Sequence, residues 1–153
     1  MSDNRIIRKL FHLGFLLKRP MTLGVRLIAS NEAGPVLLVR HTYVSGWYFP
    51  GGGVEVGETC LEAAHKELFE ETGFTTPEEP SLLAVYNNRS TSRRDHVLLY
   101  RCDDLAAERT FEPNREIAEI GFFDPSNLPD GATRATRARI DEHLFGNPVS
   151  KFW

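Results

Sequence analysis

Three glutamates with helical spacing stand near the middle of the sequence. Glu67, Glu70 and Glu71 follow one another at intervals of three and one residues, which on a helix places them within roughly a 100° arc of one face. Like charges this close repel each other unless a cation lies among them. Carboxylate oxygens favour Mg²⁺ or Mn²⁺, and the chain has no His or Cys cluster that would favour zinc. The glutamates are candidate metal ligands, although three acids alone are also typical of a solvated helix face.

The residues around these glutamates predict a helix preceded by a glycine-rich loop. Thr59 and Glu62 have the spacing of a capping box, and Gly73 is suited to a left-handed C-terminal cap. We therefore expect a helix over about residues 60–72. Residues 50–53 read Pro-Gly-Gly-Gly, and glycine allows the backbone to approach a ligand closely. The glycine loop and the carboxylates are thus expected at one site.

With these residues in view, the sequence resembles the Nudix family, whose signature is GX5EX7REUXEEXGU, where U is a bulky aliphatic or aromatic residue. One signature position departs from the family, because Lys66 stands where the family has arginine. The signature positions hold Gly52, Glu58, Lys66, Glu67, Leu68, Glu70, Glu71, Gly73 and Phe74. The flanking segments 47–52 and 116–123 are similar to the family too, whereas the first twenty residues and those after Phe145 lie outside the resemblance.

The resemblance implies a fold, an activity and a cofactor. The fold is an α/β (α+β) domain, an αβα sandwich with a mixed central β-sheet and a loop-helix that carries the signature. The activity is a metal-dependent pyrophosphohydrolase, which cleaves the diphosphate linkage of a nucleoside triphosphate, a nucleotide sugar or a similar compound and releases a nucleoside monophosphate. The cofactor is Mg²⁺ or Mn²⁺, and the partner is a nucleotide-derived small-molecule substrate.

The resemblance also assigns roles to individual residues. The backbone carbonyl of Gly52 and the carboxylates of Glu67, Glu70 and Glu71 would hold the metal, while Glu58 would hold the loop and Lys66. Glu67, Glu70, Lys66 and Glu116 are the candidate catalytic residues, and Gly73 has a structural role.

The general base varies within the family, being either a signature glutamate or an acid from a later loop. Glu116 is the leading candidate for a later acid because it directly precedes an apolar segment that ends in two phenylalanines. Glu112 and Glu119 are the alternatives. Each of these acids, taken singly, is also typical of an ordinary protein surface.

Lys66 keeps the positive charge of the family's arginine but lacks its planar fork, which holds a carboxylate by two parallel hydrogen bonds. The orientation of Glu58 or Glu70 depends on this interaction. A second hypothesis therefore stays open, namely a non-catalytic Nudix-type domain that senses a nucleotide or ADP-ribose without hydrolysing it.

Three arginines are candidates for substrate binding. Arg89 and Arg93 belong to the connection 88–95, and Arg40 stands at the end of a predicted strand near the glycine loop. Guanidinium groups bind phosphate well, but a solvated hairpin tip also explains Arg89 and Arg93.

Hydrophobic periodicity predicts the remaining elements. Residues 22–30 and 35–42 are expected to form a β-hairpin around the turn 31–34, and a short apolar stretch follows at 47–49. Further predicted elements are strands at 82–87, 96–102 and 117–123 and a last helix at 132–145. We expect one domain over residues 21–147, with residues 148–153 as a C-terminal tail.

Composition limits the class of protein. The 153 residues are 41% hydrophobic and 25% charged, which is typical of one globular domain and excludes a disordered or collagen-like chain. The net charge of −3 provides no overall basic field, so RNA is not favoured as a partner. Two cysteines, with no secretory signal before them, favour a reducing, cytoplasmic location. No apolar stretch is long enough to predict a transmembrane segment.

The N-terminal twenty residues differ from the rest. They carry a net charge of +4 against −7 for the remainder, and residues 4–18 have apolar side chains at helical spacing among basic ones. We expect an amphipathic basic helix here. It can dock on its own domain, on a partner in a homodimer, or on a membrane surface, and the sequence leaves these alternatives open.

Overall fold

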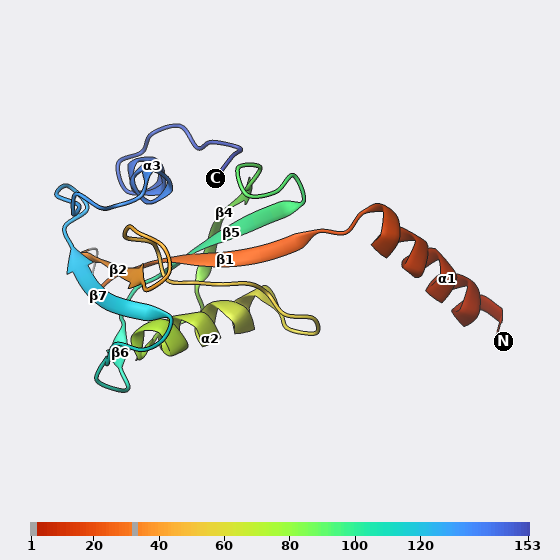
Figure 1. The fold of residues 1–153 in the computed structure, drawn as a ribbon, viewed down its shortest axis with the longest axis horizontal. Coiled ribbons are helices and arrows are strands. Elements are labelled where there is room, and N and C mark those ends of the chain that lie inside the picture. Colours follow the sequence, from red (N-terminus) through yellow and green to blue (C-terminus); the bar gives the residue numbers. More distant parts are fainter. Residues whose placement is uncertain (1–2, 32–33) are drawn as a thin grey trace.

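The computed structural model describes residues 3–31 and 34–153. Figure 1 shows a sheet region that lies between the helices α2 and α3, with α1 extending away from it. In chain order the elements are α1 (Asp3–Lys18), β1 (Thr22–Ala29), β2 (Val36–His41), α2 (Cys60–Thr72), β3 (Phe74–Thr75), β4 (Ser81–Asn87), β5 (Asp95–Cys102), β6 (Ala106–Ala107), β7 (Ile117–Phe123) and α3 (Arg134–His143).

The strands pair in a mixed pattern. β1 runs parallel to β5, with Thr22 opposite Asp95 and Ala29 opposite Cys102, while β4 is antiparallel to the other edge of β5. β2 pairs with β7 in an antiparallel sheet, and the two-residue strands β3 and β6 form a third pair. This arrangement confirms the predicted fold class, a sandwich of helices around mixed β-structure.

Two hydrophobic clusters occupy the two sides of the sheet region. Because successive side chains of a strand point to opposite faces, Val25 and Leu27 of β1 join a cluster with Ala64 and Leu68 of α2. Ile28 of the same strand joins the other cluster, which contains Phe49, Tyr86 and Ile140 of α3. Strands buried on both faces explain the continuous apolar runs in the sequence.

The predicted β-hairpin is wrong. Among the described residues, these two segments are joined by an isolated bridge between Ser30, just after β1, and Val36, and each strand pairs along its length with a distant one. The physical reason is that the other edge of β1 is already used: the Val25 N–H donates to Gly52 O at 2.9 Å and the Leu27 N–H to Pro50 O at 3.0 Å. Within the predicted turn 31–34, residues 32 and 33 lie outside the described residues.

Most element bounds agree with the predictions to within one or two residues. α3 begins two residues later than predicted because Thr133 caps its N-terminus, the Thr133 hydroxyl accepting the Thr136 N–H at 3.1 Å. The stretch 47–49 forms bridges through Trp47 and Tyr48 but no strand. β3 and β6 were not predicted, since two residues are too few to show a periodicity.

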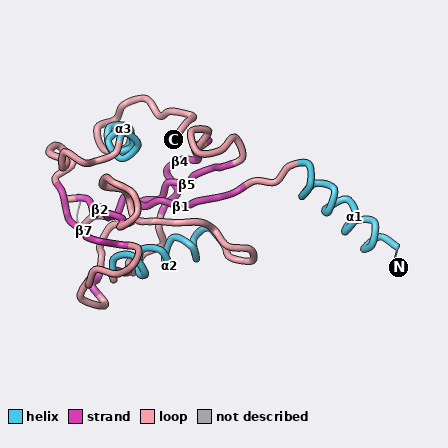
Figure 2. The backbone as a smooth tube through the Cα atoms, in the orientation of Figure 1, coloured by secondary structure: helices cyan, strands magenta, loops and turns pink. Residues whose placement is uncertain are grey.

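The two ends of the chain differ in their packing. Figures 1 and 2 show α1 extending from the start of β1 away from the sandwich. The C-terminal tail instead returns to the domain, where Trp153 packs against the cluster of α3 and its N–H donates to Asn87 O at 3.1 Å. Among the described residues, no helix is long and apolar enough to span a membrane.

Candidate active site

The helix α2 presents the signature carboxylates, and both of its predicted ends are confirmed. The Thr59 N–H donates to the Glu62 carboxylate at 2.8 Å, and the Glu62 N–H donates to Thr59 Oγ1 at 3.2 Å. Gly73 ends the helix with φ 78°, and its N–H donates to Phe69 O at 2.8 Å. These caps satisfy backbone groups that would otherwise lack partners.

The glycine loop lies along the free edge of β1, which brings it over α2. Gly51 has φ +142°, and a Cβ at this residue would lie 2.1 Å from Val25 O, so a side chain does not fit. Gly52 lies against the helix α2, because a Cβ there would lie 2.6 Å from the Glu67 carboxylate. Gly51 therefore allows the loop backbone to approach β1, and Gly52 allows it to approach the Glu67 carboxylate.

Glu71 is the most buried carboxylate of the site, with 7% of the residue exposed. Its Oε2 accepts the Gly51 N–H at 2.8 Å. Burial raises the pKa of Glu71 to about 7, against the opposing effects of that hydrogen bond and of the charge on Arg26. The structure therefore places this acid inside the domain and not on a solvated helix face.

Glu67 and Glu70 are more accessible. Glu67 is half-buried, and its burial together with the nearby charge of Glu70 raises its pKa, while Lys66 and Arg26 oppose this rise. Glu70 is exposed to solvent. The three acids share one face of α2, but each differs in burial, because Glu67 is half-buried, Glu70 is exposed and Glu71 is buried.

Lys66, at the position where the family has arginine, forms an ion pair with Glu58. Its Nζ lies 2.9 Å from Glu58 Oε1 and 3.1 Å from Oε2, and 3.8 Å from Glu67 Oε1. The Glu58 carboxylate also accepts the Glu55 N–H at 3.0 Å. That backbone hydrogen bond and the Lys66 ammonium lower the pKa of Glu58. Glu58 thus joins the loop to the helix.

Arg26 is a residue of the site that sequence reasoning missed. Its guanidinium donates to Phe49 O at 3.1 Å and also to Gly51 O, and its charge counteracts the raised pKa values of Glu67 and Glu71. The signal was present, because an arginine interrupts the apolar run of β1 between Val25 and Leu27.

Among the later acids, Glu116 lies where its charge acts on the site. It is exposed just before β7, and its N–H donates to Asn114 Oδ1 at 2.8 Å. Its charge adds to the burial that raises the pKa of Glu71 and opposes the burial that lowers the pKa of His41. Glu119 is engaged elsewhere, in an ion pair of 2.6 Å with Arg40.

The candidate substrate arginines are not gathered at the carboxylates. Arg40 pairs with Glu119, and the Arg89 guanidinium lies 3.7 Å from the centre of the Phe152 ring. Arg89 and Arg93 line a groove of about 960 Å³ between the β4–β5 connection, α3 and the C-terminal tail, and no residue of the signature lines it.

The donor atoms of the site suit a hard divalent cation. Within residues 3–31 and 34–153, no three His, Cys, Asp or Glu side chains converge as a formed metal site, because Glu67 turns to Gly52 and Lys66 while Glu71 turns to the Gly51 N–H. Burial nevertheless disfavours the ionised form of both acids, and a bound cation would offset that cost. Carboxylate and carbonyl oxygens are the ligands that Mg²⁺ and Mn²⁺ prefer.

Comparison with known proteins finds a family model and curated relatives that match the chain. The family model described as the NUDIX domain matches residues 20–144. A putative 8-oxo-dGTP diphosphatase of Bacillus subtilis is 30% identical over 108 residues, which are 71% of this chain and 70% of that protein. An ADP-ribose pyrophosphatase of Methanocaldococcus jannaschii is 40% identical over 82 residues, 52% of this chain and 47% of that protein. An RNA pyrophosphohydrolase of Psychrobacter is 41% identical over 65 residues, which are 42% of this chain and 37% of that protein.

Solved structures show the same fold. A MutT NUDIX hydrolase from Burkholderia pseudomallei has a TM-score of 0.67 at 25% identity and covers 80% of this chain and 97% of its own. A UDP-X diphosphatase has a TM-score of 0.66 at 28% identity and covers 91% of this chain and 72% of its own.

Proposed function

This chain belongs to the Nudix hydrolase family, and on that premise we propose that it is a metal-dependent pyrophosphohydrolase of a nucleoside diphosphate linked to another moiety. One observation carries the proposal: the glycine loop closes on α2 so that Gly51 and Gly52 touch the carboxylates of Glu71 and Glu67. A solvated acidic helix face would need neither this burial nor a loop without side chains.

In this proposal Mg²⁺ or Mn²⁺ is held by Glu67, Glu70 and Glu71, together with the carbonyl of Gly52. When bound, the metal neutralises the diphosphate and lowers the pKa of a coordinated water. The Gly52 oxygen accepts the Val25 N–H at 2.9 Å and keeps a second lone pair for a further contact.

The other residues of the chain position the reactants. Lys66 and Glu58 hold the loop against α2, and Arg26 fixes the carbonyls of Phe49 and Gly51. Glu116 would accept the proton of the attacking water at its carboxylate, since it is exposed to solvent and acts electrostatically on Glu71. The products are a nucleoside monophosphate and the phosphorylated remainder of the substrate.

The Lys66–Glu58 ion pair also supports the hydrolase over the sensing domain. The sensing hypothesis rests on the loss of the arginine fork at position 66. Nζ nonetheless approaches both Glu58 oxygens, at 2.9 and 3.1 Å, so the loop keeps its anchor.

The names of the relatives give different substrates, so the substrate of this chain has to be determined by experiment. The experiment is a panel of nucleoside triphosphates including 8-oxo-dGTP, nucleotide sugars, ADP-ribose, dinucleoside polyphosphates and capped RNA, each with Mg²⁺, Mn²⁺ or EDTA. We expect release of a nucleoside monophosphate from one class, with EDTA abolishing it.

Two results would contradict the proposal. Turnover that persists in EDTA would show that the reaction does not require a metal ion. Absence of turnover across the panel, with nucleotide binding still seen by calorimetry, would favour the sensing domain instead.

A further inference from the structure

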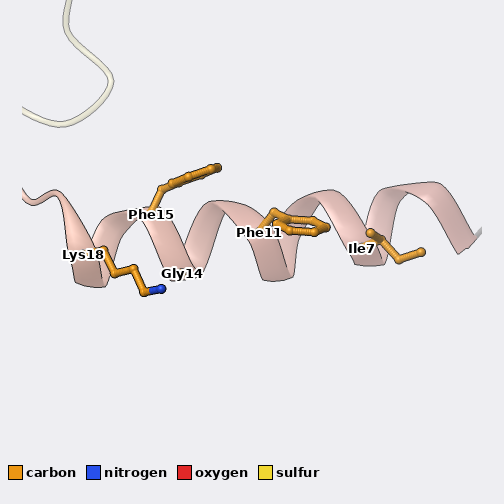
Figure 3. Close-up of a pocket in the computed structure, with 5 residues that line it drawn as sticks. All are labelled: Ile7, Phe11, Gly14, Phe15 and Lys18. Carbon is orange, nitrogen blue, oxygen red and sulfur yellow. The ribbon is translucent and has the colours of Figure 1, made fainter.

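The helix α1 exposes an unusual amount of apolar surface. Phe11 is 67% and Leu17 77% exposed, and Ile7, Leu13, Phe15 and Leu16 are exposed as well. Of the side chains of α1 that the structure describes, at residues 7–9 and 11–18, none belongs to either hydrophobic cluster of the domain. Figure 3 shows Ile7, Phe11, Gly14, Phe15 and Lys18 along the helix, where they line a shallow hollow whose described walls come from α1 alone. The domain therefore leaves this apolar surface uncovered.

Most apolar and basic side chains of α1 lie on different sides of the helix. At 100° per residue, Ile7, Phe11, Leu13 and Leu17 share roughly a 160° arc. The opposite side, roughly a 100° arc, carries Arg8, Lys9 and His12 together with Leu16, while Lys18 lies within the apolar arc. No Asp or Glu occurs between residues 4 and 21. A wide apolar face, a cationic polar face and the absence of acids are the features of helices that lie in the interface of an anionic bilayer.

A second cationic element lies where α1 joins the domain. The Thr22 N–H donates to Arg94 O at 3.0 Å, and Thr22 Oγ1 donates to Asp95 at 2.6 Å. The β4–β5 connection, with Arg93 and Arg94 exposed, is thereby fixed beside the junction (Figure 1). Met21 and Leu23 at the same junction are exposed apolar residues. Basic and apolar side chains therefore continue from α1 onto the adjoining end of the domain.

From this arrangement we propose that α1 and the adjoining β4–β5 connection form a docking surface for an anionic phospholipid bilayer. The apolar face of α1 enters the headgroup region, and the cations of α1 and of the connection contact lipid phosphates. Charge explains why the contact is confined to this end: residues 1–20 carry +4, whereas residues 21–153 carry −7 and are repelled by an anionic surface.

The test is flotation of the full chain with lipid vesicles. Vesicles of phosphatidylcholine with about 30% phosphatidylglycerol are compared with pure phosphatidylcholine at low salt and at high salt. We expect binding to the anionic vesicles, at least roughly tenfold weaker binding to the neutral ones, and loss of binding at high salt.

Matched variants separate the two parts of the surface. Arg8→Gln with Lys9→Gln is expected to lower the partition coefficient at least roughly tenfold, since each cation near an anionic surface contributes about a fivefold factor. Phe11→Ser with Leu17→Ser removes the apolar contribution and is expected to abolish flotation. Arg115→Gln, which removes an exposed cation outside the surface, is the control and should bind like the unmodified chain.

Three results would overturn the proposal. The first is an equal affinity for neutral and anionic vesicles, and the second is an equal loss in the Arg115→Gln control. The third is an unmodified chain that does not float but forms a dimer without lipid, where Phe11→Ser with Leu17→Ser dissociates the dimer. The apolar face of α1 would then pair with a second copy of the chain. Circular dichroism and a thermal melt of each variant show that the domain stays folded.

Discussion

Among the single side chains, Glu71 shows how the packing of the site opposes its charge. The carboxylate is buried and receives one hydrogen bond, from the Gly51 N–H. Burial raises its pKa to about 7, so its ionisation destabilises the metal-free fold at neutral pH. A residue that served stability alone would be expected to be uncharged here, and Glu71 is therefore better explained by the cation that it would bind.

This interpretation predicts a pH-dependent effect of Glu71→Gln in EDTA. The pKa is about 7 in the folded state and near 4.5 in the unfolded chain, so between these values the folded state holds more protons and its unfolding free energy falls as pH rises. Relative to the unmodified chain, the variant should be about 3 kcal/mol more stable at pH 8 and equal to it near pH 4.

Thermal melts of both chains across this pH range measure the difference, roughly 5–10 °C at pH 8. Addition of Mg²⁺ should stabilise the unmodified chain more than the variant. A difference that does not change with pH would show that the charge of Glu71 is not its origin.

Glu70 provides a test of activity that avoids the core. Glu70→Gln removes a carboxylate from a solvent-exposed position, so we expect turnover with Mg²⁺ to fall at least roughly a hundredfold while the melting temperature stays unchanged. Glu79→Gln, an exposed acid in the loop before β4, is the matched control. Near-normal turnover by Glu70→Gln would exclude Glu70 as a ligand.

Lys66 can be tested by substitution in both directions. Lys66→Arg restores the planar fork toward Glu58, so we expect equal or higher turnover. Lys66→Met removes the ion pair of 2.9 Å and should lower turnover, because the Glu58 carboxylate loses one of its anchors. Steady-state kinetics of the two variants measure the effect, and a large loss in Lys66→Arg would assign lysine a role of its own.

At the level of helices and strands, the ends of α2 determine where its carboxylates lie. The left-handed Gly73 ends the helix, and a Cβ there would lie 2.7 Å from Arg109 Cγ and 2.9 Å from Arg109 O. Arg109 in turn donates to the Glu70 carbonyl at 2.7 Å and to Phe69 O at 3.2 Å. The C-terminus of the helix is thus held by a glycine and by a cation from a later loop.

Gly73→Ala should therefore be more destabilising than a comparable change elsewhere. The control is Gly146→Ala, which has a similar φ of 75° but nothing within 4 Å of the new Cβ. Left-handed backbone strain costs about 1–2 kcal/mol in both variants, and only Gly73→Ala adds the clash with Arg109. Chemical denaturation measures both changes, and equal losses would show that the contact with Arg109 has no energetic effect.

For the complete chain, the C-terminal tail is part of the fold. The Arg139 guanidinium lies 4.2 Å from the Tyr86 ring centre and 5.4 Å from that of Trp153, and it pairs with Glu142 at 2.6 Å. Trp153 therefore covers a buried ion pair within α3, which contacts Tyr86 of β4 through the Arg139 guanidinium and through the Tyr86 hydroxyl that donates to Glu142 at 2.9 Å. This role was not predicted, because the last six residues show neither periodicity nor a signature.

Trp153→Ala is expected to lower the unfolding free energy by about 3 kcal/mol, since it removes a partly buried aromatic and exposes the buried ion pair. Phe145→Ala, at an aromatic residue that is 53% exposed, should cost less than about 1 kcal/mol. Denaturant titrations of both variants make the comparison. A loss in Trp153→Ala no larger than in Phe145→Ala would show that the tail does not stabilise the domain.

The local features of this protein follow from its sequence. Helix α2, its capping box and its Gly73 cap were predicted because capping depends on residues three or four positions apart. The face shared by Glu67, Glu70 and Glu71 follows from the helical repeat, and the family follows from a signature contained in residues 52–74.

The tertiary structure decided everything that depends on distant partners. β1 pairs with β5 and with the glycine loop rather than with β2, because hydrogen bonding along a strand is indifferent to sequence separation. The tertiary structure also places Arg26 beside the carboxylates and buries Glu71. Arg89 and Arg93 lie in another groove. Such contacts form between elements far apart in the chain, and local residue patterns carry no information on which distant elements will meet.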